Sequence, residues 1–266
     1  MTTPTLPIAS TLAGKTFWLS GAASGIGAAT ARALGAAGAN VLLAARDAEQ
    51  AALVARDIEA AGGCALFHRT DVLREADIAA SVDAAVRHFG RLDGAFNNAG
   101  WLCPPAPLHL QDDHALQMSL DSNVRSVFWA MRPQIAALLA GGGGAIVNMS
   151  SVNGRLTIPS IASYNASKGA INQLTRVMAL ALVDRGIRVN AVAVGSLMSG
   201  SLQRQLRDTP DLREAILADT PLGRIAGAHE LIQTVQYLAS DASSFMTGQV
   251  LTLDGGRGLL DAVSAP

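Results

Sequence analysis

The segment TFWLSGAASGIG, residues 16–27, joins a short apolar run to a glycine-rich turn, and an alanine-rich helical pattern follows at once. The apolar run predicts a buried strand, so the local order is strand, turn, helix. Glycines in such a turn allow a tight bend and let a pyrophosphate approach the free N–H groups at the start of the helix. An ordinary turn can also be rich in glycine, so the pattern needs support elsewhere. The candidate dinucleotide contacts here are Gly21, Ser24, Gly25, Ile26 and Gly27.

The same alternation of apolar runs and amphipathic segments continues along the chain. It predicts strands near 16–20, 41–45, 65–69, 93–97, 144–149, 187–193 and 249–253. It predicts helices near 25–37, 47–61, 75–89, 112–139, 163–185 and 228–239. This order indicates an α/β fold, a single Rossmann-like doubly wound domain of about seven parallel strands with helices on both faces. We expect a flexible N-terminal segment over 1–11 and one dinucleotide-binding and catalytic domain over 12–266.

Composition excludes several classes of function. Charged residues make up 15% of the chain and the net charge is -1, which argues against nucleic acid as a partner. The two cysteines, Cys64 and Cys103, are too few for a disulfide framework, and the five scattered histidines form no metal-binding pattern. No signal-like start and no apolar run of about 18 residues is present. We therefore expect a cytoplasmic protein with no metal and no membrane contact.

The end of the second predicted strand bears on the choice of cofactor. Folds that prefer NAD usually place a carboxylate there for the adenosine ribose, whereas an arginine accommodates the 2'-phosphate of NADP. This chain has Ala45 followed by Arg46, and a guanidinium matches a phosphate in a bidentate fork. Asp47 is better explained as a cap of the next helix. The sequence predicts NADP, with NAD as the alternative and a solvated Arg46 as the competing interpretation.

Polar residues also follow the third and fourth predicted strands, at the edge where open α/β sheets bind ligands. Asp71 and Val72 are candidates for the adenine side of the cofactor, although an Asp before a helix is equally typical of a cap. Asn98, Ala99 and Gly100 form a small polar corner that turn chemistry alone could explain.

The stretch from Asn148 to Lys168, NMSSVNGRLTIPSIASYNASK, carries the chemistry. Tyr164 and Lys168 are four residues apart at the start of a helical pattern, so both lie on one face. An ammonium beside a phenol stabilises the phenolate, so we expect the pKa of Tyr164 to be lowered toward neutral. One of two preceding hydroxyls, Ser150 or Ser151, would hold a carbonyl oxygen. Further upstream, Asn123 interrupts an amphipathic helix and needs a hydrogen-bond partner if buried.

These segments together resemble the short-chain dehydrogenases/reductases of the single-domain branch. The resemblance runs from about Leu12 to Gly258 and rests on the order and spacing of SGAASGIG, TDV, NNAG, SS, YNASK, GIRVNAV, PLGR and TGQVLTLDGG. It implies that Tyr164 is the general acid/base and that Lys168 lowers its pKa and binds the nicotinamide ribose. It further implies that Ser151 positions the substrate oxygen and that Asn123 supports a water relay to Lys168.

The chain departs from the family pattern at the loop after the sixth strand. Val194-Gly195 stands where relatives usually have Pro-Gly, and Ser199 replaces the usual carboxamide-binding Thr. Gly195 and Ser199 remain candidate cofactor contacts. Losing the proline frees one backbone dihedral and restores an N–H group, so the clamping of the nicotinamide is expected to differ.

The resemblance also outlines a substrate pocket, with a lid over 196–222. Its predicted walls are Leu102, Cys103, Val152, Asn153, Met198 and Leu202. We expect a small, hydrophobic ketone or secondary alcohol as substrate. Because members of this family are commonly tetramers, the resemblance also implies a homotetramer. The alternatives are an NAD-dependent sugar or cyclic-diol dehydrogenase, and a 3-oxoacyl-[acyl-carrier-protein] reductase, which would want basic residues at the cleft entrance. A nucleotide-sensing or scaffold protein is the non-enzymatic alternative, but it should have lost part of the reactive set.

Overall fold

The structure, a computed structural model, describes residues 11–262, so the expected flexible segment 1–11 lies outside this range apart from Thr11. Within this range the strands form one seven-stranded sheet in the order β3-β2-β1-β4-β5-β6-β7, and every neighbouring pair is parallel. The strands are β1 (Thr16–Ser20), β2 (Asn40–Ala45), β3 (Cys64–Arg69), β4 (Gly94–Asn97), β5 (Gly144–Ser151), β6 (Ile187–Val194) and β7 (Val250–Leu253). The Rossmann-like, doubly wound prediction is confirmed.

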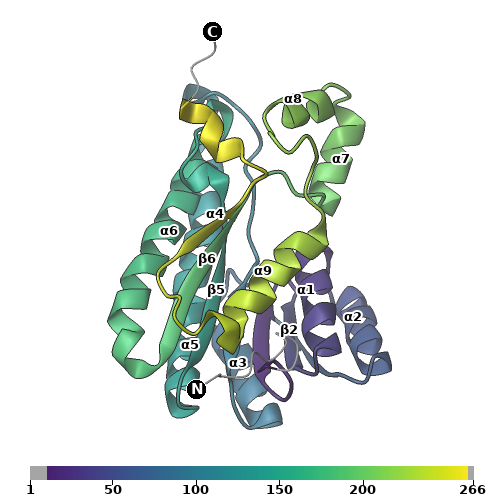
Figure 1. Ribbon diagram of the computed structural model, residues 1–266, viewed down its shortest axis with the longest axis vertical. Helices are drawn as coiled ribbons and strands as arrows, with labels where there is room; N and C mark the ends of the chain where they lie inside the picture. The colour runs from purple at the N-terminus through teal and green to yellow at the C-terminus, as the bar shows by residue number, and fades with distance from the viewer. Residues whose placement is uncertain (1–10, 263–266) are drawn as a thin grey trace, which may run out of the picture.

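Helices cover both faces of this sheet (Figure 1). They are α1 (Gly25–Ala36), α2 (Ala48–Ala60), α3 (Glu75–Phe89), α4 (Asp113–Leu120), α5 (Ser126–Ala140), α6 (Ala162–Leu182), α7 (Gly200–Asp208), α8 (Leu212–Ala218) and α9 (Ala228–Ala239). One buried cluster packs α1, α2 and α9 on one face, and a second packs α3, α5 and α6 on the other. Alternate residues of β1 divide between them, with Phe17 and Leu19 in the first and Trp18 in the second.

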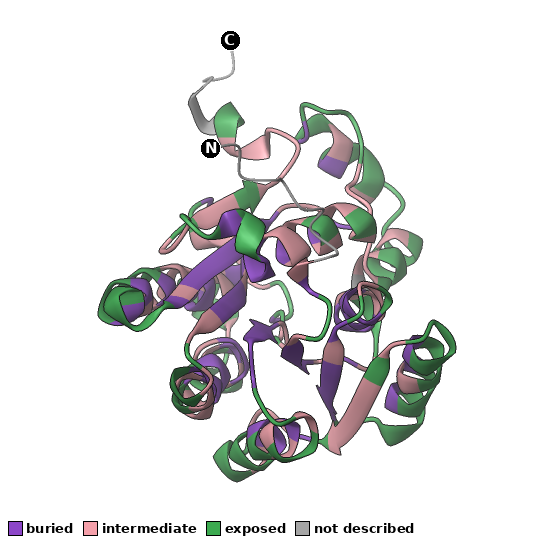
Figure 2. Cartoon of the chain, turned by 60° about the horizontal axis from the view of Figure 1, so that its bottom comes forward, coloured by how far each residue is buried: buried purple, intermediate pink, exposed green. Residues whose placement is uncertain are grey.

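Because both faces are covered, the central strands are apolar throughout rather than alternating. All five residues of β1 are buried, and so are all but the first residue of β2. Figure 2 shows the same distribution, with buried residues in the strands and exposed residues on the outer sides of the helices. None of the helices in the described part of the chain is long and apolar enough to cross a membrane.

The long helix expected over 112–139 is interrupted. Residues Asp121–Arg125 form a π-helical turn between α4 and α5, which adds one residue to the hydrogen-bonded ring at that point. The expected helix over 163–185 ends at Leu182 and is followed by a short 3-10 turn. Gly141 caps α5, and a glycine run leads into β5.

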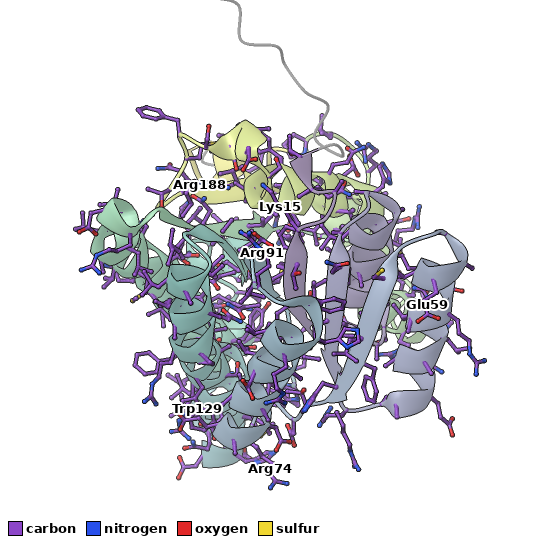
Figure 3. All side chains as sticks on the ribbon, turned by 90° about the horizontal axis from the view of Figure 1, so that it is seen from below. Lys15, Glu59, Arg74, Arg91, Trp129 and Arg188 are labelled. Atoms are coloured by element: carbon purple, nitrogen blue, oxygen red, sulfur yellow. The ribbon has the colours of Figure 1, made fainter. Side chains whose placement is uncertain are left out.

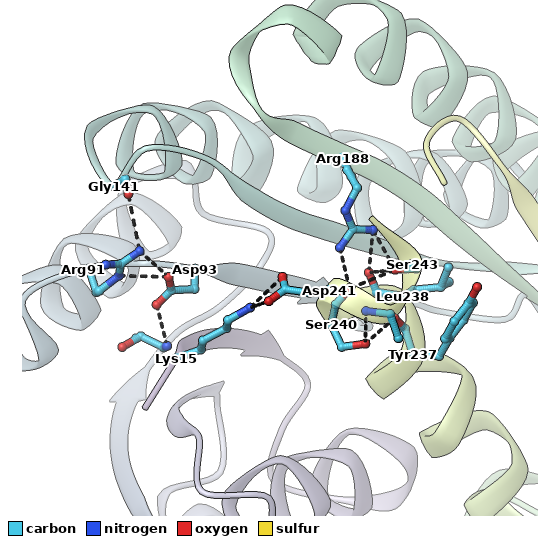
Figure 4. Close-up of polar contacts among 12 residues, drawn as sticks. Lys15, Arg91, Asp93, Gly141, Arg188, Tyr237, Leu238, Ser240, Asp241 and Ser243 are labelled. Atoms are coloured by element: carbon cyan, nitrogen blue, oxygen red, sulfur yellow. Dashed lines mark hydrogen bonds and ion pairs between the residues drawn. The ribbon is translucent and has the colours of Figure 1, made fainter. Parts of the chain in front are cut away.

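Charged side chains close the edge of the sheet at which the strands begin. Lys15 forms an ion pair with Asp241 at 2.8 Å, and Arg91 with Asp93 at 2.6 Å, while Asp93 also accepts a hydrogen bond from the N–H of Thr16. Arg188 donates to backbone carbonyls at the end of α9 (Figure 4). Lys15, Arg91 and Arg188 lie near one another in Figure 3 and line a hollow of about 240 Å³. Since each cation already has partners, these contacts hold the ends of the strands together.

Candidate active site

A cleft of about 620 Å³ opens at the carboxyl ends of the strands, beside the neighbouring strands β1 and β4, at which the strand order reverses. This is the topological switch point at which doubly wound sheets bind their ligands. The cleft is lined by ten of the predicted cofactor residues, namely Gly21, Ser24, Ile26, Gly27, Arg46, Asp71, Val72, Asn98, Ala99 and Gly100. Gly25, Gly195, Ser199, Tyr164 and Lys168 are not among its lining residues.

Close backbone packing shapes the glycine turn. Gly21 has a φ of +65°, a conformation that residues with a side chain rarely adopt. A Cβ on Gly27 would lie 2.2 Å from the carbonyl oxygen of Gly21, so α1 can approach the turn only without a side chain there. The amide of Asn98 fixes the other side by donating to the carbonyl of Ser20 at 3.0 Å. The free N–H groups at the start of α1 therefore face the cleft with little room to move.

The residues at the adenosine end of the cleft have distinct partners. Arg46 is exposed at the cleft wall, whereas Asp47 caps α2 by accepting a hydrogen bond from the N–H of Gln50 at 3.0 Å, as the sequence predicted. Asp71 accepts a hydrogen bond from the N–H of Leu73, and the N-cap position of α3 is Arg74. Asp71 therefore braces its own turn and is not the cap of α3.

Lys168 lies just beyond the end of the cleft that Gly100 lines. Its side chain is buried, and its ammonium donates a 2.9 Å hydrogen bond to the carbonyl of Met149. The same ammonium is 5.6 Å from the centre of the Tyr164 ring and would be 3.7 Å from a Cβ placed on Gly100. The structure thus brings the Tyr-Lys pair of α6 up to the corner after β4.

The expected lowering of the Tyr164 pKa is wrong for this chain. Burial raises the pKa of Tyr164 above its ordinary 10.0, the Ser151 hydroxyl opposes this by hydrogen bonding, and the nearby Cys103 thiol adds to it. Burial also lowers the pKa of Lys168 to about 8. Lys168 is not among the groups that shift the pKa of the phenol, so the cost of burying a phenolate decides the direction of the shift.

The lowered pKa of Lys168 predicts a pH-dependent stability. Between about pH 8 and about pH 10.5 the unfolded chain keeps the lysine proton that the folded chain has lost, so the free energy of unfolding rises with pH in this window. Lys168→Met removes this rise. We expect the stability of the variant relative to the parent to fall by about 2 kcal/mol between about pH 7 and about pH 9.5, measured by urea unfolding. A constant difference would contradict the burial of a titrating ammonium.

Ser150 and Ser151 have different hydrogen-bond partners. Ser150 donates to the side-chain oxygen of Asn172 on α6 at 2.6 Å, which ties β5 to α6. Ser151 accepts a hydrogen bond from the N–H of Asn153 at 3.2 Å and donates to the carbonyl of Val194 at 3.4 Å, and it is close enough to Tyr164 to lower the pKa of the phenol. Ser151 is therefore the hydroxyl next to Tyr164, and its role toward the substrate stays a prediction.

Asn123 is buried in the π-helical turn with its amide fully engaged. Its oxygen accepts the N–H of Trp101 at 2.8 Å, and its nitrogen donates to the carbonyl of Trp101 and to the hydroxyl of Ser167, both at 2.9 Å. The oxygen would be only 2.7 Å from a Cβ on Gly100. Asn123 thus fixes the backbone just after the NNAG corner, next to the ammonium of Lys168.

The predicted substrate residues differ in exposure. Cys103 and Val152 are buried, Asn153, Met198 and Leu202 are half-buried, and Leu102 is 44% exposed. A small apolar cluster packs Cys103, Ala115 and Ile161 against Trp101, Ile158 and Tyr164. The hydroxyl of Ser199 caps α7 by accepting the N–H of Leu202 at 3.2 Å, so it already has a structural role.

Sequence reasoning missed several residues of the site. Ser20 accepts hydrogen bonds from the N–H groups of both Asn98 and Ala99 at 3.0 Å and so joins the two turns at the switch point. The cleft is further lined by Ala23, Ala44, Ala45, Asp47, Thr70, Leu73, Trp101, Met118 and Ser122. A hydroxyl at the last position of the first strand was the available signal for Ser20.

Comparisons with known proteins agree with this geometry. The family model described as enoyl-(acyl carrier protein) reductase matches residues 21–257. An A-factor type gamma-butyrolactone 1'-reductase (1S-forming) from Streptomyces virginiae is 40% identical, covering 91% of this chain and 95% of the relative. A 2,5-dichloro-2,5-cyclohexadiene-1,4-diol dehydrogenase from Sphingobium indicum is also 40% identical, covering 93% and 98%.

Among solved structures, a 7 alpha-hydroxysteroid dehydrogenase complexed with NADH and 7-oxo glycochenodeoxycholic acid superimposes with a TM-score of 0.89 at 30% identity. The match covers 95% of this chain and 98% of that one. Family model, relatives and fold therefore agree over nearly the whole length. The chain belongs to the short-chain dehydrogenases/reductases, nicotinamide-dependent oxidoreductases of alcohol and carbonyl groups.

Proposed function

We propose that this enzyme interconverts a ketone and a secondary alcohol with NADP(H), with Tyr164 as the general acid/base. The observation that carries the proposal is the convergence of Ser151, Tyr164 and Lys168 at the Gly100 end of the cleft. The cleft has the fixed amides and the free helix terminus that a dinucleotide needs. Bound nicotinamide would supply or accept the hydride.

The chain's own groups would handle the proton and the substrate oxygen. In reduction, Ser151 donates a hydrogen bond to the carbonyl oxygen, and Tyr164 passes its proton to that oxygen as negative charge develops. Burial keeps the phenol protonated at neutral pH, which suits this direction. Lys168 would hold the nicotinamide ribose, and Asn123 would support a water chain to the ammonium by fixing the Trp101 backbone.

The substrate proposed is a small hydrophobic ketone or alcohol, in which a ring fits best. The apolar cluster around Cys103 and Ile161 packs against Tyr164, so the surroundings of the phenol are apolar on that side. One relative is named for a cyclic diol and one structural neighbour for a steroid. An NAD-dependent cyclic-diol dehydrogenase is therefore the second candidate. Assays of cyclic and linear ketones and alcohols with both cofactors test the function; no turnover of any would contradict it.

Arg46 is the proposed contact for the 2'-phosphate of NADP. Arg46→Ala should weaken NADPH binding about 10–100-fold, because it removes a charge-assisted hydrogen bond, and should leave NADH binding within about twofold. Titration of both cofactors by protein fluorescence measures the two affinities. Arg56→Ala, which removes an exposed guanidinium from the outer side of α2, is the matched control. Equal losses for NADPH and NADH at Arg46 would contradict the assignment.

Residues 196–222 are proposed to form the substrate lid. The segment contains α7 and α8, which project from the sheet beyond the ends of the strands (Figure 1). Met198, Leu202 and Leu206 are half-buried, while Ile216 and Thr220 anchor α8. If the segment is a lid, bound substrate should slow its cleavage by a protease. Cleavage at the same rate with and without substrate would contradict the assignment.

A homotetramer is proposed from the outer surfaces of α5 and α6. Phe128, Leu139, Val177 and Leu180 are between 41% and 79% exposed on these helices. Apolar side chains gathered on neighbouring helices are typical of a surface covered by a second copy. Sedimentation equilibrium gives the mass directly, and a monomer at micromolar concentration would contradict the proposal.

A further inference from the structure

The segment from Asp254 to Gly258, which follows β7, lies between two parts of the site. Figure 1 shows it in yellow between α6 and α8. The Asp254 carboxylate folds the segment into a tight turn by accepting the N–H groups of Gly256 at 2.9 Å and Gly258 at 2.8 Å. At its start, Gly195 donates to the carbonyl of Leu253 at 2.9 Å. The turn therefore has a fixed shape before either neighbour is considered.

Arg155 holds one side of this turn. Its guanidinium donates a 2.7 Å hydrogen bond to the carbonyl of Gly258, more than a hundred residues away in the chain. Arg155 ends the short turn that begins at Ser151, whose hydroxyl accepts the N–H of Asn153. Gly154 in the same turn packs on α6 so closely that a Cβ would lie 2.9 Å from the carbonyl of Lys168. Arg155 thus extends from a turn in contact with both Ser151 and Lys168.

The proposed lid holds the other side. The N–H of Leu222 donates to the carbonyl of Gly255 at 3.0 Å, and Arg257 pairs with Asp219 at 3.0 Å. A Cβ on Gly255 would lie 2.7 Å from the methyl group of Thr220, so the two segments are in tight contact. These contacts lie in the connection between α8 and α9, just after α8 ends.

We propose that Arg155 is a positioning residue that fixes the base of the substrate lid to the catalytic turn through the segment 254–258. It touches neither the cofactor cleft nor the reacting groups, and it acts by holding Gly258. The inference rests on the proposed function for its kinetic effect and on the contacts alone for its structural effect. The bond to Arg155 is exposed and single, so the link can break and re-form as the lid moves.

Arg155→Ala should raise the KM for the ketone about five- to tenfold and change kcat by less than about twofold, because a looser lid weakens substrate binding while the Ser151 and Lys168 contacts remain. Hydrogen–deuterium exchange of residues 212–222, measured without substrate, should accelerate by a similar factor. Arg155→Lys should restore most of both, since an ammonium can still donate to the Gly258 carbonyl. The effects of Arg155→Ala and Arg257→Ala should be less than additive, because both release the same segment.

Arg32→Ala is the matched control, since it removes a half-exposed arginine paired with Asp57 on the far helices. The proposal is overturned if Arg155→Ala leaves exchange at 212–222 unchanged, or if Arg32→Ala changes it equally. It is also overturned if kcat falls with KM constant. If the parent turns over no ketone or alcohol, the proposed function fails, while the exchange measurement still decides whether Arg155 holds the lid.

Discussion

Tyr164→Phe is expected to lower kcat for ketone reduction by about 10²–10⁴-fold, the range that loss of a general acid usually costs. The change removes one hydroxyl from a partly buried ring, so the packing against Cys103 and Ile161 is retained. Binding of NADPH should stay within about threefold, because the glycine turn and Lys168 are untouched. Steady-state kinetics together with a cofactor titration separate the two effects.

Tyr237→Phe supplies a control of the same chemistry. The Tyr237 hydroxyl donates to the sulfur of Met246 near the C-terminal end of α9, and neither residue lines the cleft. We expect this variant to keep at least about half of the parent kcat, because the lost contact is weak and remote. If Tyr164→Phe kept full ketone reduction, Tyr164 would not be the acid. A similar loss in both variants would indicate a general effect on the fold.

The burial of Tyr164 also determines how the rates of ketone reduction and alcohol oxidation change with pH. Since burial raises the phenol's pKa, the proton needed for reduction is present throughout the neutral range. Alcohol oxidation needs the phenolate, so the rate of oxidation should rise with pH into the alkaline range. The raised pKa of Tyr164 could not be predicted from the sequence. The i, i+4 spacing of Tyr164 and Lys168 shows that the two residues are neighbours, but it does not show how far they are buried from water.

The sheet could be predicted because its physical cause is local. In a parallel sheet covered on both faces, each strand is a short run of apolar residues, and such runs are visible in the sequence. Each predicted strand ends within two residues of the observed one, and the predicted helices over 75–89 and 228–239 match α3 and α9. Gly90, in the left-handed conformation, marks the end of α3 plainly.

The π-helical turn at 121–125 could not be predicted, because its cause lies in another part of the chain. The extra residue lets Asn123 face the backbone of Trp101 and the hydroxyl of Ser167, whereas the local pattern reads as one continuous helix. The link from Arg155 to Gly258 is likewise invisible in sequence, since nothing near either residue specifies the other. Long-range hydrogen bonds of this kind shape the site but leave no periodic signal.

Gly27→Ala is expected to have the second large effect. The losses in the free energy of NADPH binding and in the free energy of unfolding should together amount to about 3 kcal/mol. The added Cβ would lie 2.2 Å from the carbonyl oxygen of Gly21 and 2.8 Å from the amide of Asn98. The first of these is backbone, so α1 must move away from the turn, and forced overpacking of this kind typically costs about 1–3 kcal/mol. Such a shift would open the N–H groups that a pyrophosphate needs.

Gly200→Ala is the matched control for Gly27→Ala, because a Cβ there meets only the end of the Arg204 side chain, at 3.9 Å. The control should unfold within about 0.5 kcal/mol of the parent and bind NADPH normally, since exposed sites tolerate such changes. Urea unfolding and cofactor titration give the two parts of the loss for each variant. If Gly27→Ala binds NADPH normally and is as stable as the parent, the turn relaxes without cost. Close packing would then not require a glycine at this position.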